Sequence, residues 1–229
     1  MTRNIRILVS IILFFGCKQQ SDKIENNDSE VVFNQNVVNE LEAMVVLDQV
    51  AANIPQGQYL DYSTEEWQKF KDSVFTAHQK RLKEIFDQFG FIGYDIAGES
   101  GSYNFWLMVQ HCDHDPDFQM DVLEKMKKEV ENENADPSNF AYLTDRVNLN
   151  TGKAQIYGTQ VEHNFEIAQA YPKKLLDSAH VNERRKSVGL EPLEEYLNFM
   201  SISNFEMNKE YYLNKGINEP TLYKIEPNQ

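Results

Sequence analysis

The stretch Ser63–Gly90, STEEWQKFKDSVFTAHQKRLKEIFDQFG, decides the fold class of this chain. It opens with Ser63 and Glu66, the Ser-x-x-Glu spacing of a capping box, in which each side chain bonds a free backbone N–H at a helix start. Apolar residues then recur at the spacing of one helix face, and Gly90 is the residue type that commonly ends a helix. The apolar stripe comprises Trp67, Phe70, Val74, Ile85 and Phe89. A long amphipathic helix is therefore expected here.

Further helix signals lie on both sides of this stretch. Residues 37–52 and 103–111 carry apolar residues at helical spacing. At two later points an acidic residue that can cap a helix precedes a proline, which suits the first helical position. These pairs are Asp115-Pro116 and Asp136-Pro137. Two more helices are expected at about 179–188 and 192–200, next to Gly189 and Pro192.

The segment at about 154–170 departs from helical spacing. At its start, Gln155, Tyr157 and Thr159 alternate with other residue types, which favours strands. Gly158, placed in mid-strand, would permit close approach of another backbone or a ligand. The predicted fold is therefore mainly α, a compact multi-helix domain at 37–213 with a small β-hairpin at about 154–170. A loose C-terminal tail is expected at 214–229.

The N-terminus predicts export. Arg3 and Arg6 precede the apolar run Ile7–Phe15, which is too short for the ~20 residues that cross a membrane and is typical of a secretory signal. The run ends in Gly16-Cys17, where a lipoprotein peptidase would cleave and Cys17 would receive the lipid. Phe14 and Phe15 depart from the usual lipobox, so a plain cleaved signal and an uncleaved anchor are the alternatives.

The expected processing assigns a place to the protein. Residues 1–17 are predicted to be a lipoprotein signal peptide, and the polar residues 18–36 a flexible spacer. Acyl chains such as palmitate on Cys17 would hold the protein on a membrane of the cell envelope, periplasmic or surface-exposed. The only other cysteine, Cys112, then has no disulfide partner, so the fold must depend on its hydrophobic core.

The charge of the chain excludes one class of partner. The net charge is −14. Of the 22 basic residues, Arg3 and Arg6 belong to the signal, which leaves 20 against 36 acidic residues and a net charge of −16. Such a surface argues against nucleic acid and against anionic lipid as a second anchor. The expected partners are the membrane, through the lipid, and an unknown small molecule or envelope protein.

Polar residues at positions of apolar stripes mark the candidate site. Asp48 shares a helix face with Leu41 and Met44, and a buried carboxylate is costly unless it is paired. Gln110 and His111 continue the apolar stripe of residues 103–107 in the same way. The other histidines, His78, His163 and His180, are expected at the surface.

The segment His111-Cys112-Asp113-His114-Asp115 allows three interpretations. His111 and His114 could bind a metal with Asp113 or Asp115, although spacing alone is weak evidence. His111 could instead form a general acid–base pair with a carboxylate, while Arg146 or Arg184 binds an anionic substrate. In the third interpretation, Asp115 caps a helix and the polar residues form a buried lattice between helices. Satisfied networks of that kind are the commonest case.

Several segments resemble one bacterial family. The string FWLMVQHCDHDPDFQ at 105–119 is similar to the signature of an uncharacterised family, the domain of unknown function 6624. Further segments match in the same order over about residues 40–200: Asp48-Gln49, Ala141–Arg146, Gln155–Gln160 and Asn182–Leu190. The resemblance implies a shared domain and one polar constellation, but no reaction. Where the family pattern most often has Ala, this sequence has Cys112, which argues against a role of the thiol.

These observations favour a lipoprotein domain that binds a ligand or partner in a polar pocket. The pocket residues would be Asp48, Gln49, Gln110, His111, Asp113, Asp145, Arg146, Tyr157, Gln160 and Arg184. The alternative is a hydrolase in which His111 acts with Asp113, Asp48 or Asp145, with or without a metal. A third class, a purely structural helical module, would show an exposed apolar patch instead of a pocket.

Overall fold

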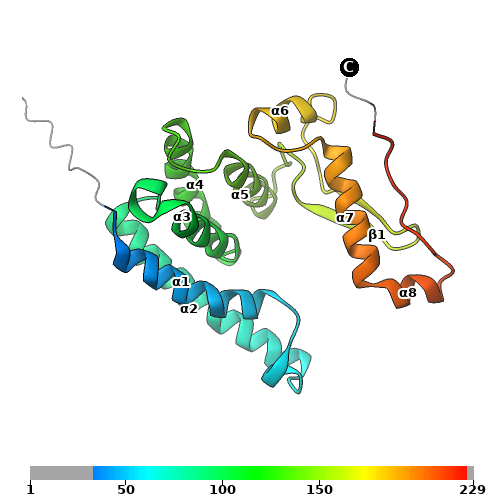
Figure 1. The fold of residues 1–229 in the computed structure, drawn as a ribbon, viewed down its shortest axis with the longest axis horizontal. Helices are drawn as coiled ribbons and strands as arrows, with labels where there is room; N and C mark the ends of the chain where they lie inside the picture. The colour runs from blue at the N-terminus through cyan, green and yellow to red at the C-terminus, as the bar shows by residue number, and fades with distance from the viewer. Residues whose placement is uncertain (1–32, 226–229) are drawn as a thin grey trace, which may run out of the picture. The chain divides into compact units, whose positions relative to one another are not determined.

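The computed structural model describes residues 33–225, which are mainly helical with one two-stranded sheet (Figure 1). The predicted signal peptide, Cys17 and most of the predicted spacer lie outside these residues. Within them the elements are α1 Gln35–Ala52, the short 3₁₀ helix η1 Gly57–Tyr59, α2 Thr64–Phe89, α3 Tyr94–Gln110, α4 Pro116–Glu131, α5 Pro137–Asn150, β1 Val161–Asn164, β2 Gln169–Pro172, α6 Val181–Ser187, α7 Leu193–Met207 and α8 Lys209–Asn214. The predicted fold class is confirmed.

Local capping explains where three of the long helices begin. Ser63 and Glu66 form the predicted capping box at the start of α2, with both reciprocal bonds present. Asp115 accepts the backbone N–H of Phe118 at the start of α4. Asp136 caps α5 in the same way. These caps satisfy N–H groups that have no partner inside the helix, so the start positions follow from sequence alone.

Helices α1 to α5 share the larger hydrophobic core. Helix α1 packs along α3 and α2, and α4 packs along α5 (Figure 1). Fully buried side chains from each layer meet in this core, among them Leu41, Leu82, Phe105, Val122 and Leu143. Burying a large aliphatic or aromatic side chain contributes roughly 1.5–3 kcal/mol each. This packing fixes the ends of α1 and α3, which carry the first candidate residues.

Helix α3 is longer than the sequence predicted. It begins at Tyr94 rather than Tyr103 and contains a break at Gly98, where φ is 66°. A side chain is disfavoured at such a φ, so glycine allows two helical pieces to join there. Glycine and serine in this segment lower its apparent helix propensity, which is why the prediction began too late.

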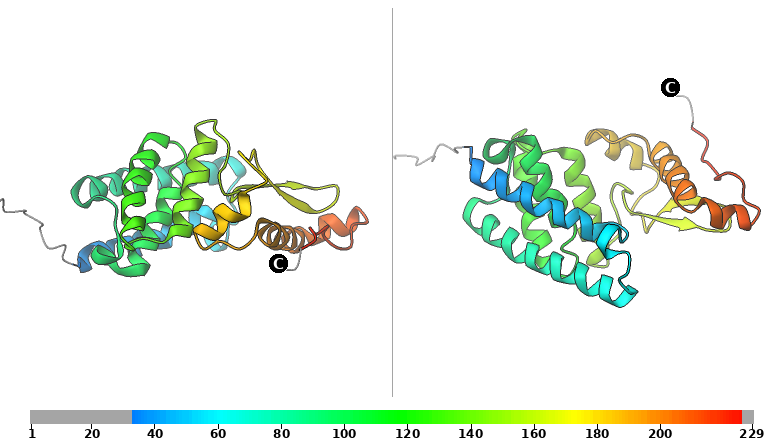
Figure 2. Two further views of the ribbon diagram at one scale, coloured as in Figure 1. Left: turned by 90° about the horizontal axis from the view of Figure 1, so that it is seen from above. Right: turned by 60° about the horizontal axis from the view of Figure 1, so that its bottom comes forward.

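The hairpin is confirmed, but its strands begin later than expected. The antiparallel pair β1–β2 covers Val161–Asn164 and Gln169–Pro172 and packs against α7 (Figure 2). Residues 155–160 form a loop before β1, with one isolated bridge from Gln155 to Leu175. Gly158 therefore lies in a loop and not in a strand; its φ is 72°, and an added Cβ would lie 3.0 Å from Leu193 Cδ1.

The segment after α8 has neither helix nor strand, yet it is anchored. Asn198 exchanges two hydrogen bonds with the backbone of Tyr223, at 2.7 and 3.0 Å. The Tyr223 hydroxyl donates to the carbonyl of Ala170 on β2. The tail at 214–229 was expected to be loose, but the chain is held in place at Tyr223 by these hydrogen bonds. No helix in the described range is long and apolar enough to cross a bilayer.

Candidate functional site

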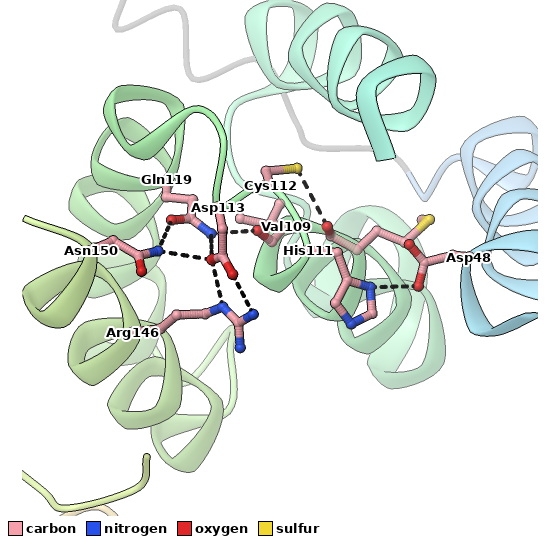
Figure 3. A network of polar contacts seen from close by, with 9 residues as sticks. Asp48, Val109, His111, Cys112, Asp113, Gln119, Arg146 and Asn150 are labelled. Atoms are coloured by element: carbon pink, nitrogen blue, oxygen red, sulfur yellow. Dashed lines mark hydrogen bonds and ion pairs between the residues drawn. The ribbon is translucent and has the colours of Figure 1, made fainter. Parts of the chain in front are cut away.

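A buried carboxylate on α1 contacts a histidine at the end of α3. The Asp48 side chain is fully buried, and its Oδ2 lies 2.8 Å from Nδ1 of His111 (Figure 3). An ionised carboxylate only accepts, so His111 must carry its proton on Nδ1. Nε2 of His111 has no partner in the described residues and is not buried. The pair therefore presents the second imidazole nitrogen of His111 to solvent.

A second histidine lies on the other side of the same carboxylate. His78 on α2 places Nδ1 3.7 Å from Asp48 Oδ1, slightly beyond hydrogen-bond distance, and its side chain is only 12% exposed. Neither atom has a hydrogen-bond partner in residues 33–225. The expectation that His78 lies at the surface is wrong. The helical spacing indicates burial, because His78 lies four residues from both Val74 and Leu82, which are buried.

The surroundings keep Asp48 ionised and hold the His111 ring. Burial raises the pKa of Asp48, but the hydrogen bonds from His111 and Gln49 and the nearby His78 outweigh burial and leave this pKa below its usual value. The ring of Phe75 on α2 packs against the His111 imidazole, with centroids 5.0 Å apart. We call Asp48, Gln49, His78 and His111 the Asp48 cluster. It has the parts of an acid–base pair: a buried acceptor, an oriented imidazole and an accessible nitrogen.

Two neighbouring amides behave differently. Gln49 donates from Nε2 to Asp48 Oδ2 at 3.1 Å, so it belongs to the Asp48 cluster. Gln110 is 5% exposed, and its Nε2 is buried without a partner in the described part of the chain. A buried amide donor without a partner costs about 1–3 kcal/mol.

A second polar group lies next to the first (Figure 3). Arg146 on α5 forms a two-point ion pair with Asp113, at 2.7 and 2.6 Å. Asn150 donates to Asp113 at 2.8 Å, and the buried Gln119 links both to the backbone carbonyl of Val109. We call Asp113, Gln119, Arg146 and Asn150 the Asp113 cluster. Burial raises the pKa of Asp113, but Arg146, Asn150 and Gln119 together lower it by more, so the pKa of Asp113 lies below its usual value.

This second cluster joins α4 and α5 to the end of α3. Its ion pair neutralises Arg146, so the guanidinium is not a free site for an anion. In Figure 3 the guanidinium of Arg146 and the ring of His111 both extend toward the bottom of the view. The two clusters are joined through the chain, because His111 and Asp113 are two residues apart.

Asp145 has a different position and a different role. Its fully buried carboxylate accepts the backbone N–H groups of Ile156, Tyr157 and Thr159 at 2.7–3.2 Å, and the Thr159 hydroxyl at 3.0 Å. Both oxygens are therefore occupied by the loop at 155–160. The structure supports a structural role for Asp145 and does not bring it to His111.

The other side of this loop is held by two arginines of α6. Arg184 donates to the carbonyl of Ile156 and to Asp177. Arg185, fully buried, donates to the carbonyl of Tyr157 at 2.9 Å and lies over the ring of Tyr196. Burial lowers the pKa of Arg185. The guanidinium of Arg184 is thus occupied by the carbonyl of Ile156 and by Asp177.

The remaining candidates of this segment also serve the loop. Tyr157 is half-buried, and burial together with Asp145 raises its pKa. The backbone N–H and carbonyl of Gln160 bond the side chain of the buried Gln155, at 2.7 and 2.8 Å. The Gln160 amide itself donates to Thr159 Oγ1 at 3.4 Å. Sequence reasoning placed these residues in one pocket with His111; the structure places them in a separate group.

The metal candidates do not converge in the structure. Asp115 caps α4 and accepts Gln79 Nε2, and His114 is exposed, while His111 contacts Asp48. Among residues 33–225, no three His, Cys, Asp or Glu side chains are grouped in a way that could hold a metal ion. Cys112 is a buried free thiol, and burial raises its pKa strongly.

Comparison with known proteins adds the family. The family model described as a family of unknown function (DUF6624) matches residues 35–205, from the first turn of α1 to the last turns of α7. Both clusters lie inside this range. Neither the curated proteins nor the solved structures contain a significant match. The resemblance seen in the sequence is thereby confirmed: the chain belongs to the family of unknown function DUF6624.

Proposed function

We propose that this chain is a lipid-anchored lipoprotein of the bacterial cell envelope, whose helical domain binds a ligand or partner beside the Asp48 cluster. The anchor rests on the signal-like N-terminus and Cys17. The binding site rests on one observation: the buried Asp48 orients His111 through Nδ1 and leaves Nε2 accessible. A polar group that is open to solvent and held in place by a buried carboxylate favours a ligand.

The anchor is tested by metabolic labelling. The full chain is expressed in a Gram-negative host supplied with an alkyne fatty acid, and the label is read after membrane fractionation. The wild type should carry the label and remain with the membranes. Cys17→Ala should lose the label. Equal labelling of both proteins, or no labelling of the wild type, would contradict the anchor.

A second candidate function is a hydrolase with His111 as general base. The Asp48–His111 contact of 2.8 Å favours it, because an aspartate that fixes the tautomer of a histidine is a recurring device of acyl-transfer enzymes. No nucleophile is assigned, so His111 would activate water.

The enzyme candidate is tested with p-nitrophenyl acetate and p-nitrophenyl phosphate. The wild type is compared with His111→Gln and with His114→Gln, an exposed histidine three positions along the same segment that serves as the matched control. A general base contributes about 10²–10⁴-fold, so the His111 variant should lose at least this factor while the control keeps its rate. No turnover by the wild type, or equal rates in all three, would remove the hydrolase for these two ester classes.

A further inference from the structure

A polar pocket lies at the start of α3, apart from the Asp48 cluster. Its volume is about 470 Å³, within the range of pockets that hold small molecules. Residues of α3 on both sides of the break at Gly98 line it, together with residues at the start of α5. Ser102, one of the lining residues, precedes His111 by nine residues, a rise of about 14 Å along a helix. The pocket is therefore separate from the site proposed above.

Every side chain that lines this pocket carries a hydrogen-bonding group. Four hydroxyls and two carboxamides accompany two carboxylates, those of Glu99 and Asp136, and the lining contains no Lys, Arg or His. Neither carboxylate forms an ion pair within residues 33–225. A cleft lined by one sign of charge concentrates ligands of the opposite sign. The lining therefore favours a cation.

The two carboxylates act on the same tyrosine. Burial raises the pKa of Tyr94, and the negative charges of Asp136 and Glu99 raise it further. Asp136 uses only Oδ1 to cap α5, where this oxygen accepts the N–H groups of Ser138 and Asn139. Its Oδ2 remains free as an acceptor. Two carboxylates near one phenol thus keep oxygen atoms available for a ligand.

One buried hydroxyl of the lining has no partner. Ser102 is only 4% exposed. Its hydroxyl forms no hydrogen bond within the described part of the chain, yet the oxygen is not sealed off, because Ser102 lines the pocket. A buried polar group without a hydrogen bond is costly. This hydroxyl therefore favours a ligand that itself carries hydrogen-bonding groups.

An aromatic ring of the lining is held in place from behind. Tyr103 is 47% exposed and packs against Trp106, with ring centroids 5.4 Å apart. Trp106 in turn donates from Nε1 to the carbonyl of Asn139 at 2.8 Å. A tyrosine ring attracts a cation over its face, within about 6 Å of the centroid. The ring thus adds to the attraction for a cation and offers an apolar surface to the rest of the ligand.

These features also identify the kind of cation. A metal ion is far smaller than the pocket, and no three His, Cys, Asp or Glu side chains among residues 33–225 are grouped to hold one. A quaternary ammonium has no N–H group, so it would leave the hydroxyl of Ser102 without a partner. A primary ammonium carries three N–H donors, and carboxylate and hydroxyl oxygens accept them.

From these features we infer that the pocket binds a small organic molecule through a primary ammonium group. Glu99 and Asp136 pair with the charge, and Ser102 accepts one of the N–H groups. Tyr103 covers the carbon skeleton next to the charge. The inference does not rest on the proposed function, because the pocket shares no residue with the Asp48 cluster.

Saturation-transfer difference NMR tests the pocket, with benzylamine as the probe and benzyl alcohol as a neutral molecule of nearly the same shape. The full chain is held in phosphatidylcholine nanodiscs near neutral pH, where the amine is protonated, and empty nanodiscs give the background. Titration of each probe gives its Kd. The wild type should bind benzylamine at least ~10-fold more tightly than benzyl alcohol, as for a hydrogen bond to a charged group. Equal affinities, or no binding of benzylamine, overturn the inference.

Charge variants locate the binding. Glu99→Gln combined with Asp136→Asn removes both charges at constant size, and asparagine remains a good helix cap. This double variant should bind benzylamine no more tightly than benzyl alcohol. The matched control is Asp117→Asn combined with Glu124→Gln, which removes the same two charges from exposed positions on α4 and should keep the preference. A preference that survives in the pocket variant, or that is lost equally in the control, overturns the inference.

A third variant tests the buried hydroxyl. Ser102→Ala should weaken benzylamine binding roughly 2–10-fold, the value of one hydrogen bond. Its stability in urea should not fall, because the hydroxyl loses no partner within residues 33–225. An unchanged affinity for benzylamine would place the amine outside this pocket and overturn the inference.

Other occupants give different results. Binding of methyl α-glucoside but not of benzylamine would assign the pocket to neutral saccharides. Tighter binding of Ca²⁺ than of benzylamine, lost in the double charge variant, would assign it to a metal ion. Either result overturns the ammonium ligand.

Discussion

Replacing Asp145 by alanine should destabilise the fold strongly. The carboxylate accepts three backbone N–H groups of the loop at 155–160 and one hydroxyl. Alanine leaves these donors without their acceptor. Each buried donor without a partner costs about 1–3 kcal/mol. Thr159 is buried, whereas Ile156 and Tyr157 are half-buried and gain some solvation.

The free energy of unfolding is therefore expected to fall by about 3–5 kcal/mol. This is near the lower end of the summed cost of all the donors, because some of them gain solvation. Because domains are stable by only about 5–15 kcal/mol, the variant should lie close to unfolding. Asp145→Asn keeps one oxygen for the donors but turns an N–H toward the others, so an intermediate loss of about 1–3 kcal/mol is expected.

Urea unfolding followed by far-UV circular dichroism measures these differences. Asp121→Ala is the matched control, because Asp121 is exposed on α4; its effect should stay within about 0.5 kcal/mol. Unchanged slopes of the unfolding free energy against urea would show that the variants differ in stability and not in mechanism. A loss below about 1 kcal/mol for Asp145→Ala would refute the structural role and restore Asp145 as a functional candidate.

Three further predictions follow from single features. Asp48 has a lowered pKa in the folded protein, so its ionised form stabilises the fold above the unfolded pKa of about 3.9, and this contribution is lost as pH falls through the lower folded pKa. The wild type should therefore lose its stability advantage over Asp48→Asn as the pH falls below about 4. An advantage that grows on acidification would contradict this prediction. Ser63→Ala removes the capping box and should cost about 1 kcal/mol in urea unfolding, with Gln68→Ala as an exposed control on the same helix. Cys112 is buried with a raised pKa, so iodoacetamide should modify it, as mapped by mass spectrometry, far more slowly in the native protein than in denaturant; equal rates would show that the segment between α3 and α4 opens readily.

The parts of the fold that could be predicted depend on short-range signals. The capping box at Ser63 and the Asp-Pro pairs act within one turn, so their effect can be recognised without knowledge of the tertiary structure. The prediction that residues 155–160 form part of a strand is wrong, because the interactions that decide the structure of this segment are long-range. Asp145 accepts hydrogen bonds from the N–H groups of this loop, and Arg185 donates one to the carbonyl of Tyr157. These backbone groups therefore have partners without a neighbouring strand.

His78 shows a different limit. The spacing of α2 through Val74 and Leu82 does indicate that this position faces the core. Residue type does not decide the question, since histidine is intermediate between apolar and charged residues in how often it is buried. The partner that makes burial acceptable, Asp48, lies on another helix. A histidine on one apolar stripe and a carboxylate on another are therefore best considered together.

The same signal, a polar residue on an apolar stripe, selected residues with opposite roles. It detects burial, and burial alone does not distinguish a structural group from a functional one. The distinction comes from the hydrogen-bonding capacity that remains. Asp145 fills both oxygens with the loop, and Asp113 fills both with Arg146, so neither has a strong demand for a further partner. In residues 33–225, Asp48 keeps an unpaired Oδ1 and orients a histidine whose Nε2 is accessible. The argument for a binding site therefore rests on the Asp48 cluster.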